Sequence, residues 1–142
     1  MKFFIASPWK NREEVNYLSQ ELKKRGHNVS SFIESGANLL SGQPIEDEMK
    51  MFSEALANWK SDPRISQIFE SELKSLKESD SVIMLLPAGI SSHLEAGIAY
   101  GWGKKLILIG PIIKPEIVYL IFDELYIDMS SFLRDLTSKV VE

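Results

Sequence analysis

Short apolar runs of strand length alternate with segments of helical periodicity, and this alternation limits the folds that the chain can adopt. Three of these runs are four to six residues long and cover residues 3–6, 81–86 and 106–109. Continuous apolar runs of that length are typical of strands buried on both faces, as in parallel sheets.

A helix and a further strand are expected between the first two runs. Val15, Leu18 and Leu22 recur at helical spacing, Gly26 is a suitable C-terminal cap, and residues 28–33 resemble a strand. A strand–helix–strand unit with tight joints indicates a parallel sheet. Right-handed crossovers between such units give an open sheet. We therefore predict an α/β fold: one doubly wound, flavodoxin- or Rossmann-like parallel sheet of about five strands, with helices on both faces.

The sequence pattern defines the remaining helices and strands less clearly. Helices are expected over residues 64–77 and 92–102, and the chain after Pro111 contains a short helix, a fifth strand and a final amphipathic helix. Residues 34–63 mix loop-like and helical signals. Because insertions after a strand often carry substrate contacts, we interpret this segment as a candidate lid.

Composition narrows the possible classes of function. A chain of 142 residues is expected to form one domain, residues 1–142. Acidic and basic residues are interspersed with a net charge of −4, so no nucleic-acid partner is expected. Cysteine is absent and only two histidines occur, so neither a metal nor another cofactor is expected. We find no signal peptide and no apolar stretch of membrane-spanning length, and expect a cytoplasmic protein.

The residues that follow the strands are the first candidates for a binding site. Open α/β sheets bind ligands outside the carboxyl ends of their strands. Ser7, Pro8 and Trp9 follow the first strand, and residues 87–91 follow the strand at 81–86. Trp9, and Trp59 in the segment 34–63, can stack on a flat base, although a core position is also open for both.

Glu95 has two interpretations. Ser92 and Glu95 have the spacing of a capping box, in which each side chain satisfies a free backbone N–H at the start of a helix. Alternatively, Glu95 is a catalytic nucleophile, since its helix begins directly after a strand and small residues leave the region open. At a helix N-terminus we expect the carboxylate to stay ionised.

Glu72 also has two interpretations. It lies four residues after Ile68 and four before Leu76, within or beside the apolar stripe of its helix. Glu72 either lies at the margin of the stripe and reaches solvent, or it points into a wet cleft. In a cleft, apolar neighbours would raise its pKa and suit it to act as an acid.

Four polar residues near the strand at 81–86 complete the candidates. Asp80 precedes that strand and is expected to bind local backbone in a turn. Ser91 and Ser92, beside His93, lie where free N–H groups of a helix can hold a phosphate, although such serines are usually caps.

The stretch SDSVIMLLPAGISSHLEAGIAYGWGKKLILIG, residues 79–110, resembles the central motif of nucleoside 2-deoxyribosyltransferase-like proteins. It is similar to the small branch with the pattern P-x-G-x-S-x-H-L-E-x-G followed by G-x-G-K. Two further segments, IASPW at residues 5–9 and KPEIVYLIFDEL at residues 114–125, also have counterparts there. The resemblance covers most of the chain, and residues 34–63 are its weakest part.

The resemblance implies roles for individual residues. Glu95 falls on the glutamate that attacks the anomeric carbon, and Glu72 falls where the transferases commonly carry an aspartate that handles the proton of the base. Ser7, Pro8, Trp9 and Asp80 lie in or beside segments with counterparts in the family, which makes them candidate substrate-binding residues.

The loop before Glu95 falls where members hold the 5′ end of the sugar. Gly89, Ser91 and Ser92, with His93 beside them, supply no carboxylate, which favours a 5′-phosphate or another anion. The implied substrate is a nucleoside or nucleotide, and the implied assembly is a homo-oligomer, a dimer or larger.

Two alternatives remain open. TIR-like domains have a related layout and use a glutamate in a serine-flanked helix to cleave nicotinamide from NAD. The chain can also be a non-catalytic nucleotide-binding domain in which Glu95 only caps its helix. The glutamate at position 72, in place of aspartate, favours this last interpretation most.

Overall fold

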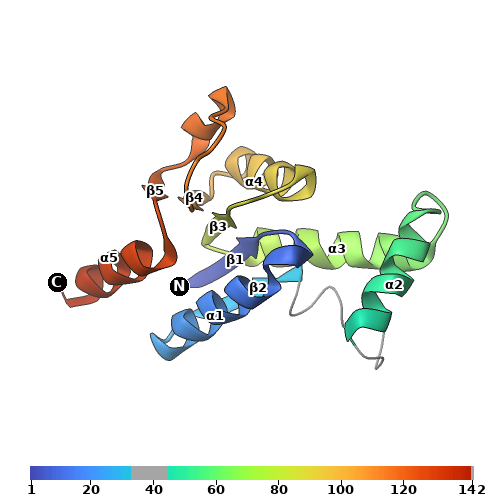
Figure 1. Cartoon of the computed structure of the whole chain (residues 1–142), viewed down its shortest axis with the longest axis horizontal. Coiled ribbons are helices and arrows are strands. Elements are labelled where there is room, and N and C mark those ends of the chain that lie inside the picture. Colours follow the sequence, from blue (N-terminus) through green and yellow to red (C-terminus); the bar gives the residue numbers. More distant parts are fainter. Residues whose placement is uncertain (33–44, 142) are drawn as a thin grey trace.

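A single parallel sheet forms the centre of the molecule (Figure 1). The computed structural model describes the backbone of residues 1–32 and 45–141 and the side chains of residues 1–32 and 50–139. Five parallel strands lie in the order β2-β1-β3-β4-β5. Their bounds are Lys2–Ala6 (β1), Asn28–Ser31 (β2), Ser81–Leu85 (β3), Lys105–Ile109 (β4) and Glu124–Tyr126 (β5). The predicted five-stranded parallel sheet is confirmed.

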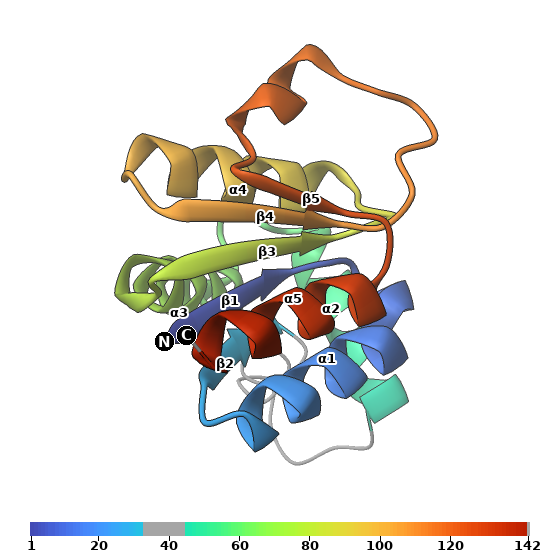
Figure 2. The same ribbon diagram turned by 90° about the vertical axis from the view of Figure 1, so that its left-hand side faces the viewer.

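Helices cover both faces of this sheet. Figure 2 shows α1 and α5 side by side on the face toward the viewer, with α3 and α4 on the other face. The bounds are Arg12–Lys24 (α1), Ile45–Leu56 (α2), Pro63–Glu78 (α3), Ile90–Gly101 (α4) and Met129–Val141 (α5), with short 3-10 helices at Trp9–Asn11 (η1) and Ile117–Ile121 (η4). Helix α2 packs against α3. The doubly wound arrangement is therefore also confirmed.

Alternation along the strands builds two separate cores. In β1, Phe3 and Ile5 pack with α1 and α5, whereas Phe4 and Ala6 pack with α3 and α4. Successive side chains of a strand point to opposite faces, so a strand covered on both sides must be apolar throughout. This requirement explains why the short apolar runs identified the central strands from the sequence.

The ends of the helices follow from local chemistry, with one departure from expectation. Asp62 caps α3 by accepting a hydrogen bond from the Arg64 backbone at 2.9 Å. Gly26 follows α1 with a φ of +86°, as its predicted capping role requires. Helix α4, however, begins at Ile90 with Gly89 as its N-cap, two residues earlier than predicted. The loop expected at residues 34–44 lies outside the described residues.

Four aromatic residues of the C-terminal part belong to the two cores or pack against them. Phe132 is buried, and Tyr126 packs against its cluster; Tyr119 and Phe122 pack on the opposite face. The segment that exposes apolar surface is instead η4 and its flanks, including Ile113, which project away from the sheet (Figure 2).

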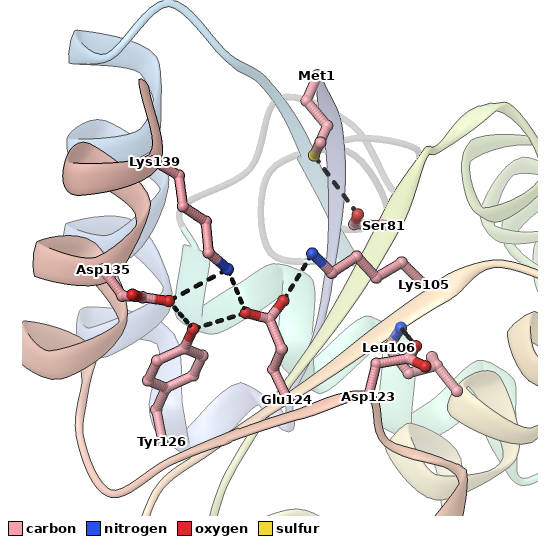
Figure 3. A network of polar contacts seen from close by, with 9 residues as sticks. All are labelled: Met1, Ser81, Lys105, Leu106, Asp123, Glu124, Tyr126, Asp135 and Lys139. Carbon is pink, nitrogen blue, oxygen red and sulfur yellow. Dashed lines mark hydrogen bonds and ion pairs between the residues drawn. The ribbon is translucent and has the colours of Figure 1, made fainter. Parts of the chain in front are cut away.

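A network of ion pairs and hydrogen bonds links α5 to the edge of the sheet (Figure 3). Glu124 of β5 forms ion pairs with Lys105 of β4 and with Lys139 of α5, both at 2.7 Å. The Tyr126 hydroxyl lies within hydrogen-bond distance of Glu124 and of Asp135. Although burial raises the pKa of Glu124, hydrogen bonds from Lys105, Lys139 and Tyr126 lower it to about 2. Glu124 is thus ionised at neutral pH, and the Tyr126 hydroxyl, whose pKa burial and the neighbouring carboxylates raise, stays protonated.

Among the described residues, every helix is too short or too polar to cross a membrane.

Candidate active site

A cavity of about 590 Å³ opens at the carboxyl edge of the sheet, where ligands of such folds bind. Ser7, Pro8 and Trp9 line it directly after β1, and the start of α4 contributes Gly89 and Ser91. Helices α2 and α3 form the opposite wall. The remaining lining residues are Phe32, Phe52, Leu56, Ile65, Ile68, Phe69, Glu72, Leu73, Leu76, Ile90, Ser92, Leu94, Glu95 and Ile98.

The two candidate glutamates meet inside this cavity. Glu72 comes from α3 and Glu95 from α4, two helices that lie against each other on the same face of the sheet. Their carboxyl groups are joined by a side-chain hydrogen bond. Glu72 therefore points into the cleft, and the alternative in which it lies at the margin and reaches bulk solvent is wrong.

Burial and mutual repulsion govern the charge of this pair. Burial raises the pKa of Glu95 from the ordinary 4.5, and the charge and hydrogen bond of Glu72 raise it further, to about 8. Burial also raises the pKa of Glu72, opposed by the hydrogen bond from Glu95. Two carboxylates at hydrogen-bond distance cannot both be ionised without a large cost, so the pair holds one proton at neutral pH.

Two expectations for Glu95 require correction. A capping box with Ser92 is wrong, because α4 begins at Ile90 and its N-cap Gly89 makes no side-chain cap bond. Ser92 is the third helical residue and Glu95 the sixth, so Glu95 is too far along to reach the free N–H groups. The expectation of a simple ionised carboxylate is also wrong, because burial and Glu72 raise its pKa to about 8.

Asn11, which the sequence did not single out, holds two strand ends together below the cavity. Its amide nitrogen donates to the Ser7 hydroxyl at 2.8 Å and to the Pro87 carbonyl at 2.7 Å. The Ser7 hydroxyl in turn donates to the Leu85 carbonyl at 3.0 Å. Both side chains are buried, so Ser7 acts by joining β1 to β3. The only sequence signal is an amide four residues after a serine at a strand end.

Two other predicted residues do not line the cavity. Asp80 lies at the amino end of β3, the far end of the sheet, where it accepts a hydrogen bond from the Lys2 backbone at 2.7 Å. The expected partner was local backbone, and the observed partner lies 78 residues away. His93 turns away from the cavity: Nδ1 donates to the Gly89 carbonyl at 2.7 Å and Nε2 lies 3.0 Å from the Tyr119 hydroxyl.

The cavity wall is apolar and acidic. Its lining includes two carboxyl groups but no lysine, arginine or histidine, and residues 33–49 contain none of these in their sequence. The nearby cation that we identify is Arg12, whose guanidinium lies 5.2 Å from the centre of the Trp9 ring. No cluster of three or more potential metal ligands occurs among the described residues. Trp59, a second candidate for base stacking, is exposed outside the cavity.

Comparison with solved structures shows the same fold in nucleoside-processing enzymes. A 2-deoxyribosyltransferase from Bacillus psychrosaccharolyticus superposes with a TM-score of 0.66 at 20% identity, over 94% of this chain and 90% of that chain. A CMP N-glycosidase from Clostridium botulinum gives 0.58 at 18% identity, over 96% and 99%. A conserved protein from Enterococcus faecalis V583 gives 0.67 at 14% identity, over 98% of both chains.

No protein-family model and no curated protein sequence matches the chain significantly. At 14–20% identity, the structural similarity establishes the fold. The fold implied by the resemblance of residues 79–110 is therefore confirmed, and the chemistry must be argued from the cavity.

Proposed function

We propose that the chain belongs to the nucleoside 2-deoxyribosyltransferase-like family and cleaves or transfers the N-glycosidic bond of a nucleoside or a nucleoside 5′-monophosphate. The observation that carries the proposal is the hydrogen bond between Glu72 and Glu95 within one apolar cavity. A nucleophile and an acid on facing carboxyl groups are what a retaining glycosidic reaction requires. The shared fold with a 2-deoxyribosyltransferase and a CMP N-glycosidase supports the assignment.

The first step breaks the bond between the sugar and the base. The Glu95 carboxylate attacks C1′ and forms a glycosyl ester, while the electron pair of the C1′–N bond passes to the base. Glu72 donates a proton to the departing nitrogen. In the free protein the pair holds a single proton, and this proton must lie on Glu72 when C1′ is attacked. The proton count is therefore correct for the reaction.

The second step releases the sugar. Glu72, now a carboxylate, accepts a proton from water or from an incoming base as that nucleophile attacks C1′. The ester bond breaks, Glu95 regains its carboxylate, and Glu72 is again protonated. Water gives hydrolysis, and a second base gives transfer.

Substrate entry must separate the two carboxyl groups. In retaining glycosidases these groups lie about 5–5.5 Å apart, farther than a direct hydrogen bond allows. The sugar must therefore displace the hydrogen bond between Glu72 and Glu95 when C1′ approaches. The Gly89–Ser91 turn and the start of α4 border the same cavity and can receive the 5′ end.

The test is intact-protein mass spectrometry with chromatography of the released base. Deoxynucleosides, their 5′-monophosphates and NAD are incubated with the wild type, with Glu95→Gln and with Glu70→Gln, a control for an exposed glutamate on α3. We expect a sugar adduct on Glu95 and free base from one substrate class, both absent in Glu95→Gln and retained in Glu70→Gln. Absence of both signals with every substrate would leave only the binding-domain interpretation.

We also propose a homo-oligomer. The segment around η4 exposes several large apolar side chains, an arrangement more typical of an interface than of a free surface. They are Ile112, Ile113, Ile117, Val118 and Leu120. Sedimentation analysis should show a dimer or larger species, and a monomer at micromolar concentration would contradict this assignment.

A further inference from the structure

Among the residues that the structure describes, large apolar side chains form almost the entire wall of the cavity beside Glu72. Phe69 and Leu73 flank Glu72 on α3, and Ile65 lies one turn before Phe69 on the same side of the helix. Helix α2 adds Phe52 and Leu56, and Phe32 follows β2. A leaving group that takes its proton from Glu72 must therefore lie against this apolar wall.

Two side chains of this wall are exposed far more than apolar core residues are. Phe69 keeps 57% of its surface accessible and Leu56 keeps 47%, although both line the cavity. Exposed apolar surface of this kind marks a ligand-binding groove or an interface. Because the patch is continuous with the buried carboxyl pair, the group that covers it must also reach Glu72.

Few polar groups along the described part of the cavity are available to hydrogen-bond to an unsubstituted base. The Ser7 hydroxyl and the Asn11 amide are occupied by the hydrogen bonds that join β1 to β3. Ser92 is only 3% exposed, and the exposed Ser91 belongs to the start of α4, which we assign to the 5′ end of the sugar. No asparagine, glutamine or threonine lines the cavity among the described residues. Against the described wall of α2 and α3, an unsubstituted base would place its amino and carbonyl groups on apolar side chains, which costs binding energy.

We infer that the substrate carries a large apolar substituent on its base, and that this substituent covers Phe69 and Leu56. The inference rests on the proposed N-glycosidic reaction, because that reaction fixes the base on the side of Glu72. The substrate class is thus an N-glycoside of a heteroaromatic base extended by an aromatic or branched aliphatic group. The base still leaves through its ring nitrogen, and Glu72 still supplies the proton.

Matched pairs of substrates test the inference. N6-benzyl-2′-deoxyadenosine is compared with 2′-deoxyadenosine, and N4-benzyl-2′-deoxycytidine with 2′-deoxycytidine, each as the nucleoside and as the 5′-monophosphate. Within a pair the sugar and the leaving nitrogen are the same, so the difference reports the contact with the substituent. Turnover is measured on the wild type, and Kd is measured by calorimetry on Glu95→Gln, which is expected to bind without reacting.

We expect at least one benzyl compound to bind about tenfold or more tightly than its parent, with a matching gain in kcat/KM. Phe69→Ala should reduce that preference about threefold or more. Tyr17→Ala should leave it unchanged, since Tyr17 is similarly exposed, at 51%, but lies on α1 outside the cavity.

Three results would overturn an assignment. The apolar substituent is contradicted if both unsubstituted parent compounds bind as tightly as their benzyl derivatives or more tightly, or if no compound binds. Neither result bears on the glycosidic reaction, which is judged by base release alone. A benzyl preference that survives Phe69→Ala unchanged contradicts the assigned wall. A benzyl preference in Glu95→Gln without base release by the wild type supports the apolar binding class and refutes the proposed reaction.

Discussion

Replacing Glu95 by glutamine should stabilise the protein, and the gain should grow with pH. Glu95 has a folded-state pKa of about 8, above the ordinary 4.5 that applies when the chain unfolds. A carboxyl group with a raised pKa contributes stability that is fully present below the unfolded pKa and is lost as pH rises through the folded pKa. Wild-type stability should therefore fall between about pH 4.5 and pH 8.

The size of this effect follows from the shift itself. Each pH unit in that window costs about 1.4 kcal/mol, so the loss between pH 4.5 and pH 7 is about 3 kcal/mol. Glutamine has no proton to lose, and its amide can donate to Glu72 in place of the protonated Glu95. The free energy of unfolding of Glu95→Gln should therefore match that of the wild type near pH 4.5 and exceed it by about 2–3 kcal/mol at pH 7.

Urea denaturation of both proteins at about pH 5, 6, 7 and 8 measures this difference. Glu70→Gln is the control, since Glu70 is exposed on the same helix as Glu72 and should show no comparable trend. A difference between Glu95→Gln and the wild type that stays constant with pH would refute the assignment of the shared proton. A variant less stable than the wild type at pH 7 would refute it as well.

Three further perturbations test other parts of the structure. Glu72→Asp should break the hydrogen bond to Glu95 and move the alkaline limb of the kcat/KM profile, which reports the free protein, below about pH 8. Glu72→Gln should remove that limb and most of the turnover, and an unchanged kcat/KM profile in both variants contradicts the pairing. Asn11→Ala should cost about 1–3 kcal/mol in urea denaturation, because it removes the donor shared by the buried Ser7 hydroxyl and the part-buried Pro87 carbonyl. Glu124→Gln should lower stability at neutral pH but not below about pH 2, since the Glu124 contribution is present above the ordinary 4.5 and lost as pH falls to about 2; an equal loss at both pH values would contradict the ionised network.

The elements that the sequence predicted best are those whose pattern depends on burial alone. Strands β1, β3 and β4 are covered on both faces, so their residues must be apolar and the runs are visible without any structure. Helix α4 was placed two residues late because its N-cap is Gly89, which has no side chain to mark the start. The serines that follow have the local pattern of a cap and are ordinary helical residues instead.

The sequence identified both glutamates of the cavity but not their electrostatics. The positions of Glu72 and Glu95 follow from helical spacing and from the motif, and both line the cavity. Their hydrogen bond depends on the packing of α3 against α4, a contact between segments more than twenty residues apart that no local pattern encodes. For the same reason the sequence could not give the pKa of Glu95, which reflects burial and the neighbouring carboxyl group together.

The structure changes the interpretation of the glutamate at position 72. The family that the sequence resembles commonly has aspartate at this position. Glutamate is longer by one methylene, and from the sequence this difference favoured a domain without activity. In the structure, the Glu72 side chain reaches Glu95, and the two carboxyl groups share a proton inside an apolar cavity. An aspartate on α3 would leave a gap that water could fill, and Glu95 would then ionise more readily. The longer side chain thus lets Glu72 hold the pKa of Glu95 high while the two groups are in contact. Under the proposed reaction, a substrate that separates the pair would lower that pKa and so provide the nucleophile.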